Sequence, residues 1–288
     1  MSTAAEVRRE VEAELAGRIP GALSWRPLAS PERLSCGVAE VDKVLGGGLP
    51  LGAIVELTGA HSSGRTTLAL STLAQATLAQ TTGQGESCAY VDVGDGLNPA
   101  SAAEMGVDLR CLLWVRIARH GHGEQRRSGG GRWTGLEQGL RAGDLLLNCG
   151  GFRVVVLDLG EVAPEQARRV PLATWYRFRL QAEKSRTLLL LLSRAACAES
   201  CAAVSLHCRQ GRIDWQQTVP AAGSGVATLP DATTLQGPRL LVGMEYRVEV
   251  ERRRTNDSAV AGNSFAYPSR KPPAFAEAEW RSTAAWSR

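Results

Sequence analysis

The feature that most constrains this chain is a nine-residue stretch from Gly59 to Thr67 with the sequence GAHSSGRTT. It follows the apolar run Ala53–Leu57, a predicted strand, and precedes a stretch predicted to be an amphipathic helix. A loop in this position points several backbone N–H groups at one spot, and the helix N-terminus adds positive potential. Such loops typically bind phosphate. The candidate phosphate-binding residues are Gly59, Ser62, Ser63, Gly64, Arg65, Thr66 and Thr67.

Two positions of this loop bear on catalysis. Arg65 stands where phosphate-binding loops of this type carry lysine, and Thr66 stands where a hydroxyl would bind magnesium. A guanidinium is wider than a compact ammonium, so Arg65 can neutralise phosphate charge without placing it for phosphoryl transfer. Two interpretations stay open: a loop that binds nucleotide without efficient hydrolysis, and a relic loop that only caps its helix.

Predicted strands and helices alternate along the chain, which indicates an α/β fold with a mostly parallel, doubly wound sheet. The predicted strands are 53–57, 87–93, 112–117, 152–159, 187–192, 203–208, 211–215 and 240–252. The predicted helices are 3–16, 39–45, 66–81, 99–105, 135–147, 164–169 and 171–184. Asp158 follows the apolar run Val154–Leu157, where an aspartate would hold magnesium through water; the alternative is an acid that caps a turn.

Composition and charge narrow the class of protein. The chain has 288 residues, of which 44% are hydrophobic and 22% charged, as expected for a globular protein with one large core or two small ones. No apolar run reaches the length of a membrane span, and the N-terminus lacks the apolar region of a secretory signal, so we expect a cytoplasmic protein. A net charge of +4 permits contact with DNA but does not imply it.

The seven cysteines predict neither disulfides nor a metal site. Most of them stand beside apolar residues in predicted strands or helices, as small buried side chains do in a reducing compartment. Cys197, Cys201, His207 and Cys208 are close in sequence, but their spacing differs from the Cys-x-x-Cys of zinc sites.

Three segments are expected: residues 1–33 as an N-terminal helix and linker, 34–255 as the core, and 256–288 as a tail without stable fold. The tail is polar and carries three aromatic residues, Phe275, Trp280 and Trp286. Aromatic side chains exposed in a flexible tail are common anchors for a partner protein. The alternative is that the tryptophans fold back onto the core.

The core, about residues 34–255, resembles the RecA recombinase family. The resemblance is carried by LSCG at 34–37, GGLPLG at 47–52, SSGRT at 62–66, YVD at 90–92, LNP at 97–99, GVD at 106–108 and VVVLD at 154–158. It implies the fold of the RecA ATPase core, with ATP or ADP and magnesium as candidate ligands.

The chain departs from that family where the chemistry lies. Gly94 stands at the position of the glutamate that activates water, with Asp95 beside it. Ser101 aligns near the aromatic residue that stacks on adenine, and Arg194 replaces the glutamine that senses the γ-phosphate. In the family, two DNA-binding loops follow the positions of Asp158 and Arg194, and in this chain both stretches are short. The resemblance therefore predicts lost ATP hydrolysis and at most weak, nonspecific DNA binding.

One basic feature of the family is kept. Arg252 and Arg254 have the spacing of two basic residues that reach the neighbouring subunit's nucleotide in RecA filaments. The alternative is that they form an exposed strand end.

Several further segments resemble the ImuA-type accessory proteins of DNA-damage-induced mutagenesis. They are RIPGA at 18–22, LLWVR at 112–116, residues 151–159 and TWYRFR at 174–179. That resemblance implies a non-catalytic adaptor in translesion mutagenesis, with an ImuB-type polymerase homologue, RecA and an error-prone polymerase as candidate partners. The alternatives are a regulator that caps RecA filaments and a weakly active RecA- or RadA-like ATPase that depends on DNA.

Overall fold

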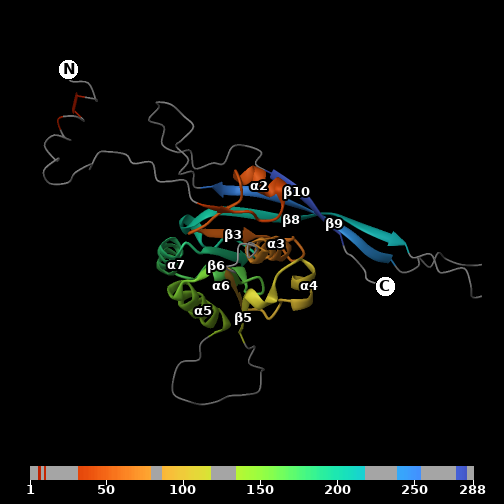
Figure 1. Ribbon diagram of the computed structural model, residues 1–288, viewed down its shortest axis with the longest axis horizontal. Helices are drawn as coiled ribbons and strands as arrows, with labels where there is room; N and C mark the ends of the chain where they lie inside the picture. The colour runs from red at the N-terminus through yellow and green to blue at the C-terminus, as the bar shows by residue number, and fades with distance from the viewer. Residues whose placement is uncertain are drawn as a thin grey trace, which may run out of the picture. The chain divides into compact units, whose positions relative to one another are not determined.

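The structure, a computed structural model, describes residues 6, 7, 10, 32–78, 86–117, 134–217, 239–253 and 277–283 (Figure 1). Except for the first three, all of these lie in one compact unit, which is formed by residues 31–254 and 269–288. Glu6, Val7 and Glu10 are helical and exposed. Within the described part of the chain, no helix is long and apolar enough to cross a membrane.

A large mixed sheet forms the centre of this unit. In the described residues its strands lie in the order β10-β9-β8-β3-β7-β6-β4-β5. The six strands from β8 to β5 are parallel, and β9 and β10 are added as antiparallel strands. The strands are β3 Ile54–Thr58, β4 Ser87–Asp92, β5 Leu112–Arg116, β6 Phe152–Asp158, β7 Leu188–Ser193, β8 Ala202–Gln217, β9 Arg239–Arg253 and β10 Glu277–Thr283.

Helices cover both faces of the sheet, as Figure 1 shows for α3 on one side and for α5 and α7 on the other. The α-helices are α2 Ala39–Leu45, α3 Arg65–Leu78, α4 Pro99–Glu104, α5 Gly135–Cys149, α6 Pro164–Ala167 and α7 Leu172–Ser185. Two 3₁₀ turns, η2 Leu109–Cys111 and η3 Glu199–Cys201, and a small pair, β1 Arg33–Leu34 with β2 Leu49–Pro50, complete the described elements. The predicted α/β fold with a mostly parallel, doubly wound sheet is confirmed.

The apolar runs form strands because both faces of the parallel sheet are buried. In β7, Leu188, Leu190 and Leu192 pack into the cluster beneath α3, whereas Leu189 and Leu191 pack into the cluster beneath α5 and α7. Alternate side chains point to opposite faces of a strand, so one run of leucines supplies two cores. This arrangement fixes the ends of β3, β4 and β6 at one edge, where the site lies.

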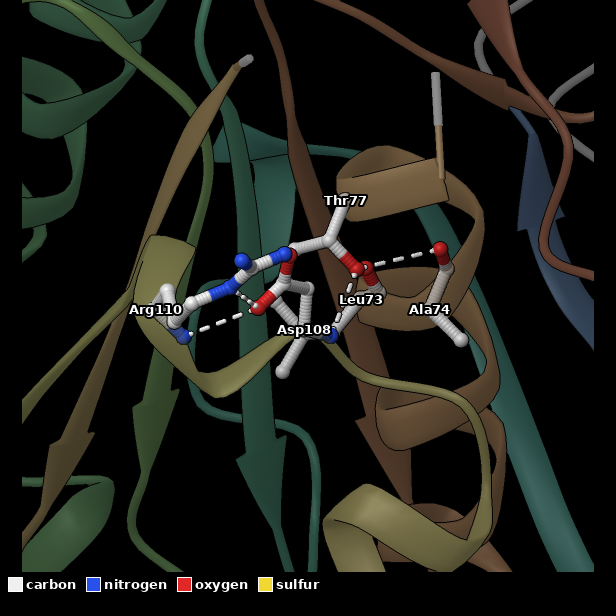
Figure 2. Close-up of polar contacts among 5 residues, drawn as sticks. All are labelled: Leu73, Ala74, Thr77, Asp108 and Arg110. Atoms are coloured by element: carbon white, nitrogen blue, oxygen red, sulfur yellow. Dashed lines mark hydrogen bonds and ion pairs between the residues drawn. The ribbon is translucent and has the colours of Figure 1, made fainter. Parts of the chain in front are cut away.

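Thr77 ties the far end of α3 to the turn that precedes β5 (Figure 2). Its hydroxyl donates to the carbonyl oxygens of Leu73 and Ala74, at 2.9 and 3.2 Å, and accepts the Asp108 N–H at 3.2 Å. The Asp108 carboxylate in turn accepts the backbone N–H of Arg110 at 3.0 Å and pairs with its guanidinium. The helix that follows the phosphate loop is thus held at its far end as well.

The expectation of an unstructured tail over residues 256–288 is wrong for residues 277–283. These residues form β10, which pairs with β9 in register from Glu277 opposite Glu249 to Thr283 opposite Gly243. Ala278 is buried in the core cluster. The strand forms because its charged residues alternate with smaller or apolar ones that face the core.

The separate strands predicted at 203–208 and 211–215 are one strand, β8. It stays continuous because β9 pairs with it from Val204 opposite Arg253 to Gln217 opposite Arg239. The pairing register of β8 with β9 shifts at several points, one of them between Gln210 and Ile213.

Candidate functional site

The predicted phosphate loop connects β3 to α3 and is shaped by backbone positions that few residues tolerate. Ser62 and Gly64 have positive φ angles, 58° and 89°. A Cβ atom at Gly64 would lie 2.6 Å from the Tyr246 ring, and one at Gly59 would lie 2.4 Å from the Cys208 carbonyl oxygen. Glycine is therefore required at both positions, because β8 and β9 pack directly against the loop.

The loop forms one wall of a cleft of about 260 Å³. The other walls come from the ends of β4 and β6 and from β9. The lining residues are Ala60, His61, Ser62, Ser63, Gly64, Arg65, Thr66, Thr67, Asp92, Gly94, Gly96, Asp158, Gly160, Glu161, Met244 and Tyr246. The cleft thus brings together the predicted loop residues Ser62 to Thr67, the predicted Asp158 and the expected catalytic position Gly94, whereas Gly59 does not line it.

Two buried donors of the loop lack a hydrogen-bond partner. Ser63 and Arg65 are 3% and 7% exposed, and neither Oγ of Ser63 nor Nη1 of Arg65 makes a hydrogen bond. Buried polar groups in proteins are rarely left unpaired. Two unpaired donors in the wall of one cleft, beside the start of a helix, are suited to bind an anion.

Burial lowers the pKa of Arg65, and the negative charge of Asp158 is the main influence that raises it. A guanidinium remains protonated in proteins despite such shifts. A Cβ atom at Gly160 would lie 3.4 Å from Nη2 of Arg65 and 2.9 Å from Oδ1 of Asp158. The guanidinium and this carboxylate therefore border the same small space.

Asp158 ends β6 as predicted, but its carboxylate already has two partners. Oδ2 accepts a hydrogen bond of 2.6 Å from the Tyr90 hydroxyl, and Oδ1 accepts the Gly160 N–H at 2.8 Å. Burial raises the pKa of Asp158, and these two hydrogen bonds oppose the rise. Burial and the neighbouring Asp158 also raise the pKa of Tyr90, which keeps this hydroxyl protonated as a donor. The sequence analysis did not include Tyr90 in the site.

The position expected for a catalytic glutamate holds Gly94, which lines the cleft. Asp95 does not take over the role: it pairs with Arg116 through two bonds of 2.8 Å, from Nε to Oδ1 and from Nη2 to Oδ2. The Arg116 guanidinium also lies over the Trp114 ring, 4.8 Å from its centroid. Asp95 is thus held by the edge strand β5 and does not line the cleft.

Asp92 also lines the cleft, yet it holds the loop that follows β4. Oδ1 accepts the N–H of Gly96 at 2.9 Å, and Oδ2 accepts the N–H of Leu97 at 3.0 Å and Nε1 of Trp114 at 3.2 Å. Its side chain is fully buried. A carboxylate with three donors and no exposure is a structural brace.

Glu161 is the exposed carboxylate of the cleft wall. It lies 3.6 Å from Nδ1 of His61 and 3.9 Å from Nη2 of Arg194. Arg194, which replaces the expected sensor glutamine, also donates from Nε to the Gly160 carbonyl oxygen at 2.9 Å. Arg194 therefore fastens the turn after β6 and does not line the cleft.

The remaining predicted site residues lie elsewhere. Arg252 is partly buried on β9, where Nη2 donates to the Ala202 carbonyl oxygen at 3.4 Å. Arg254, Phe275 and Trp286 lie outside the described residues. The expectation of Trp280 exposed in a flexible tail is wrong, because it stands on β10 with its ring 5.1 Å from that of Tyr246.

Tyr246 and Met244 of β9 line the cleft, and the sequence analysis did not identify either of them. Tyr246 is buried between the loop glycine Gly64 and Trp280 of β10. The available signal was the alternation of apolar and polar residues in 239–253, which shows that Tyr246 and Val248 share a face. The alternation could not show that this face meets the loop, because Tyr246 and Gly64 are more than 180 residues apart in the sequence.

Comparison with known proteins finds relatives for the part of the chain that contains the loop and the first strands of the large sheet. Residues 26–165 match the model of the RecA N-terminal domain. Protein RecA of Haemophilus ducreyi is 35% identical over 128 residues, which are 44% of this chain and 29% of the relative. Protein RecA of Agrobacterium fabrum is 34% identical over 174 residues, 58% of this chain and 41% of the relative. The matched regions thus span less than half the length of these two relatives.

Among solved structures, the crystal structure of the RadB recombinase is similar. The likeness has a TM-score of 0.47 and 16% sequence identity, and it covers 77% of this chain and 91% of that one.

Proposed function

We propose that this chain is a non-catalytic, RecA-like accessory protein of bacterial DNA-damage-induced translesion mutagenesis. In this role it retains a phosphate-binding loop without hydrolysing ATP, and it binds an ImuB-type polymerase homologue, with RecA as a further candidate partner. Support comes from the match to the RecA N-terminal domain over residues 26–165 and from the resemblance of further segments to ImuA-type proteins.

One observation carries the non-catalytic part of the proposal. Gly94 occupies the cleft where a general base is needed, and Asp95 is turned away into its pair with Arg116. A general base must reach the attacking water within hydrogen-bond distance. Asp92 cannot serve either, because three donors hold it in the interior.

The loop residues fit the phosphate groups of ATP or ADP. Ser63 Oγ and Arg65 Nη1 are unpaired donors, and both residues line the cleft. In this proposal a bound nucleotide is a structural ligand that orders the face of the molecule around the cleft.

Copurification tests the adaptor role. The full chain, the ImuB-type polymerase homologue and RecA of one bacterium are mixed in pairs and separated by size exclusion, with each protein alone as the control. We expect the chain to coelute with the polymerase homologue. Failure to coelute with either partner would contradict the adaptor role. Coelution with RecA alone, together with inhibition of RecA filament growth, would favour the alternative of a filament-capping regulator.

A second candidate function rests on Glu161. This carboxylate is exposed in the wall of the cleft and lies near His61, so it is the available replacement for the missing base. Weak ATP hydrolysis that disappears in Glu161→Gln would support a slow ATPase. The contacts of Glu161 with Arg194 and His61 favour a structural role, because they join the turn after β6 to β7 and to the phosphate loop.

A further inference from the structure

We propose that the cleft binds its phosphate ligand without a divalent cation. The Arg65 guanidinium takes over the role of the magnesium charge, and the Tyr90 hydroxyl binds the Asp158 carboxylate that would otherwise hold the ion. The inference rests on the phosphate-binding loop of the proposed function and specifies how that site neutralises its ligand. It concerns nucleoside diphosphates and triphosphates as a class.

The first step is the state of Asp158. In phosphate loops of this type, magnesium is held by a loop hydroxyl and by an aspartate at the end of a neighbouring strand. Here the hydroxyl of Tyr90 and the N–H of Gly160 donate to the two oxygens of that aspartate. Tyr90 itself is fully buried on β4, so its hydroxyl cannot turn away into solvent.

The second step is the position of the positive charge. Nη2 and Nη1 of Arg65 lie 3.4 and 3.7 Å from the site of a Cβ on Gly160, and Oδ1 of Asp158 lies 2.9 Å from the same point. The guanidinium therefore stands beside the carboxylate that a magnesium ion would use through water. Magnesium needs near-octahedral oxygen coordination and keeps several waters. A fixed positive charge next to its ligand opposes its binding by repulsion.

The third step is what the same charge offers to a phosphate. Arg65 is 7% exposed, Nη1 has no partner, and the side chain lines the cleft together with the unpaired Ser63 Oγ. A buried guanidinium with a free N–H is a strong donor to phosphate oxygens. Arg65 can therefore supply the neutralising charge that magnesium supplies elsewhere.

Calorimetric titration of the full chain with ADP tests this inference, once with excess magnesium chloride and once with EDTA. We expect the two dissociation constants to agree within about threefold. Arg65→Ala should weaken ADP binding at least about tenfold in EDTA, since it removes the neutralising charge. Arg110→Ala is the matched control, because Arg110 is exposed and pairs with Asp108 away from the cleft. It should leave binding unchanged.

The double variant Arg65→Lys, Tyr90→Phe frees Oδ2 of Asp158 and replaces the wide guanidinium by a compact ammonium. It should bind ADP about tenfold more tightly with magnesium than with EDTA. Wild-type binding that weakens tenfold or more in EDTA would overturn the inference and leave the phosphate site intact. Absence of ADP binding in both buffers would overturn the phosphate site and this inference together.

Discussion

Asp92 and Asp158 end two neighbouring strands and stand opposite each other in the register of β4 and β6. Both residues line the cleft, and both carboxylates are bound by donors of the protein itself. Carboxylates at the ends of parallel strands are well placed to serve a ligand. In this chain they serve the fold: Asp92 holds the loop after β4, and Asp158 holds Tyr90 and the turn after β6.

Replacing Asp92 with alanine should lower the free energy of unfolding by about 2–4 kcal/mol, because it leaves the N–H of Leu97 and the indole of Trp114 without their acceptor. Urea denaturation measures the change. Asp144→Ala is the control, because its bond to Arg177 lies at the surface and should contribute less than about 1 kcal/mol. Equal losses in the two variants would argue against the bracing role of Asp92.

The cysteines offer a test of the core. Burial raises the pKa of Cys88 and of Cys208 to about 12, so both remain neutral thiols at pH 8, whereas Cys149 is exposed on α5. Brief alkylation at pH 8 followed by mass spectrometry should label Cys149 and spare the other two until the protein unfolds. Labelling of Cys88 or Cys208 as fast as Cys149 would contradict the packing described here.

Sequence patterns located the loop and Asp158, because each stands at a fixed place relative to a predicted strand, and the resemblance to the RecA family located Gly94. They could not locate Tyr90 as the partner of Asp158, since 68 residues separate the two and only the pairing of β4 with β6 brings them together. Sequence patterns also left the role of Asp95 open, because its partner Arg116 lies on the neighbouring strand β5.

At the scale of elements, β9 and β10 form an antiparallel addition at the β8 edge of a parallel sheet. The addition closes the site, since β9 supplies Tyr246 and β10 supplies the Trp280 ring behind it. Residues 277–283 therefore belong to the core of the molecule, and Trp280 supports the cleft through its contact with Tyr246.

Truncation before Glu277 should lower the melting temperature by about 5–10 °C, because it removes the buried Ala278 and exposes the edge of β9. Truncation after Thr283 is the matched control and should leave the melting temperature unchanged. Both are measured by circular dichroism on heating. A shorter chain that melts like the full one would show that β10 contributes nothing to stability.

Long apolar or amphipathic elements were predicted within a few residues, because their period is a direct consequence of burial. β10 was missed although Glu277, Glu279 and Arg281 alternate with Ala278, Trp280 and Ser282. Its pattern carries few β-branched residues, and the proline-containing stretch before it is typical of a tail. The short pair β1 and β2 has two residues on each side, too few to produce a period.

At the scale of the whole molecule, the net positive charge is small. It amounts to +4, and in the described part of the chain three arginines of β8 and β9 are paired with acids. These pairs are Arg209 with Glu249, Arg212 with Asp214, and Arg247 with Glu279. The stretches after β6 and β7 are short, with helix α6 beginning at Pro164 and η3 at Glu199.

We therefore expect only weak DNA binding, with a dissociation constant above about 10 µM at physiological salt and no preference for sequence. Fluorescence anisotropy with a labelled single strand should show the affinity falling as salt rises, because the contacts are to phosphates. A stable nucleoprotein filament at physiological salt, seen by electron microscopy, would disprove this expectation.

The measurement that tests the central claim most directly is ATP hydrolysis by the purified full chain, with and without single-stranded DNA. With Gly94 in place of a base, and Asp95 held by Arg116, we expect no turnover stimulated by DNA. Loss of a general base alone costs about 10²–10⁴-fold in rate. Thr66→Ala and Glu161→Gln should match the wild type at background level. Turnover comparable to that of a working recombinase, and abolished by Thr66→Ala, would contradict the claim that this cleft binds phosphate without catalysing its transfer.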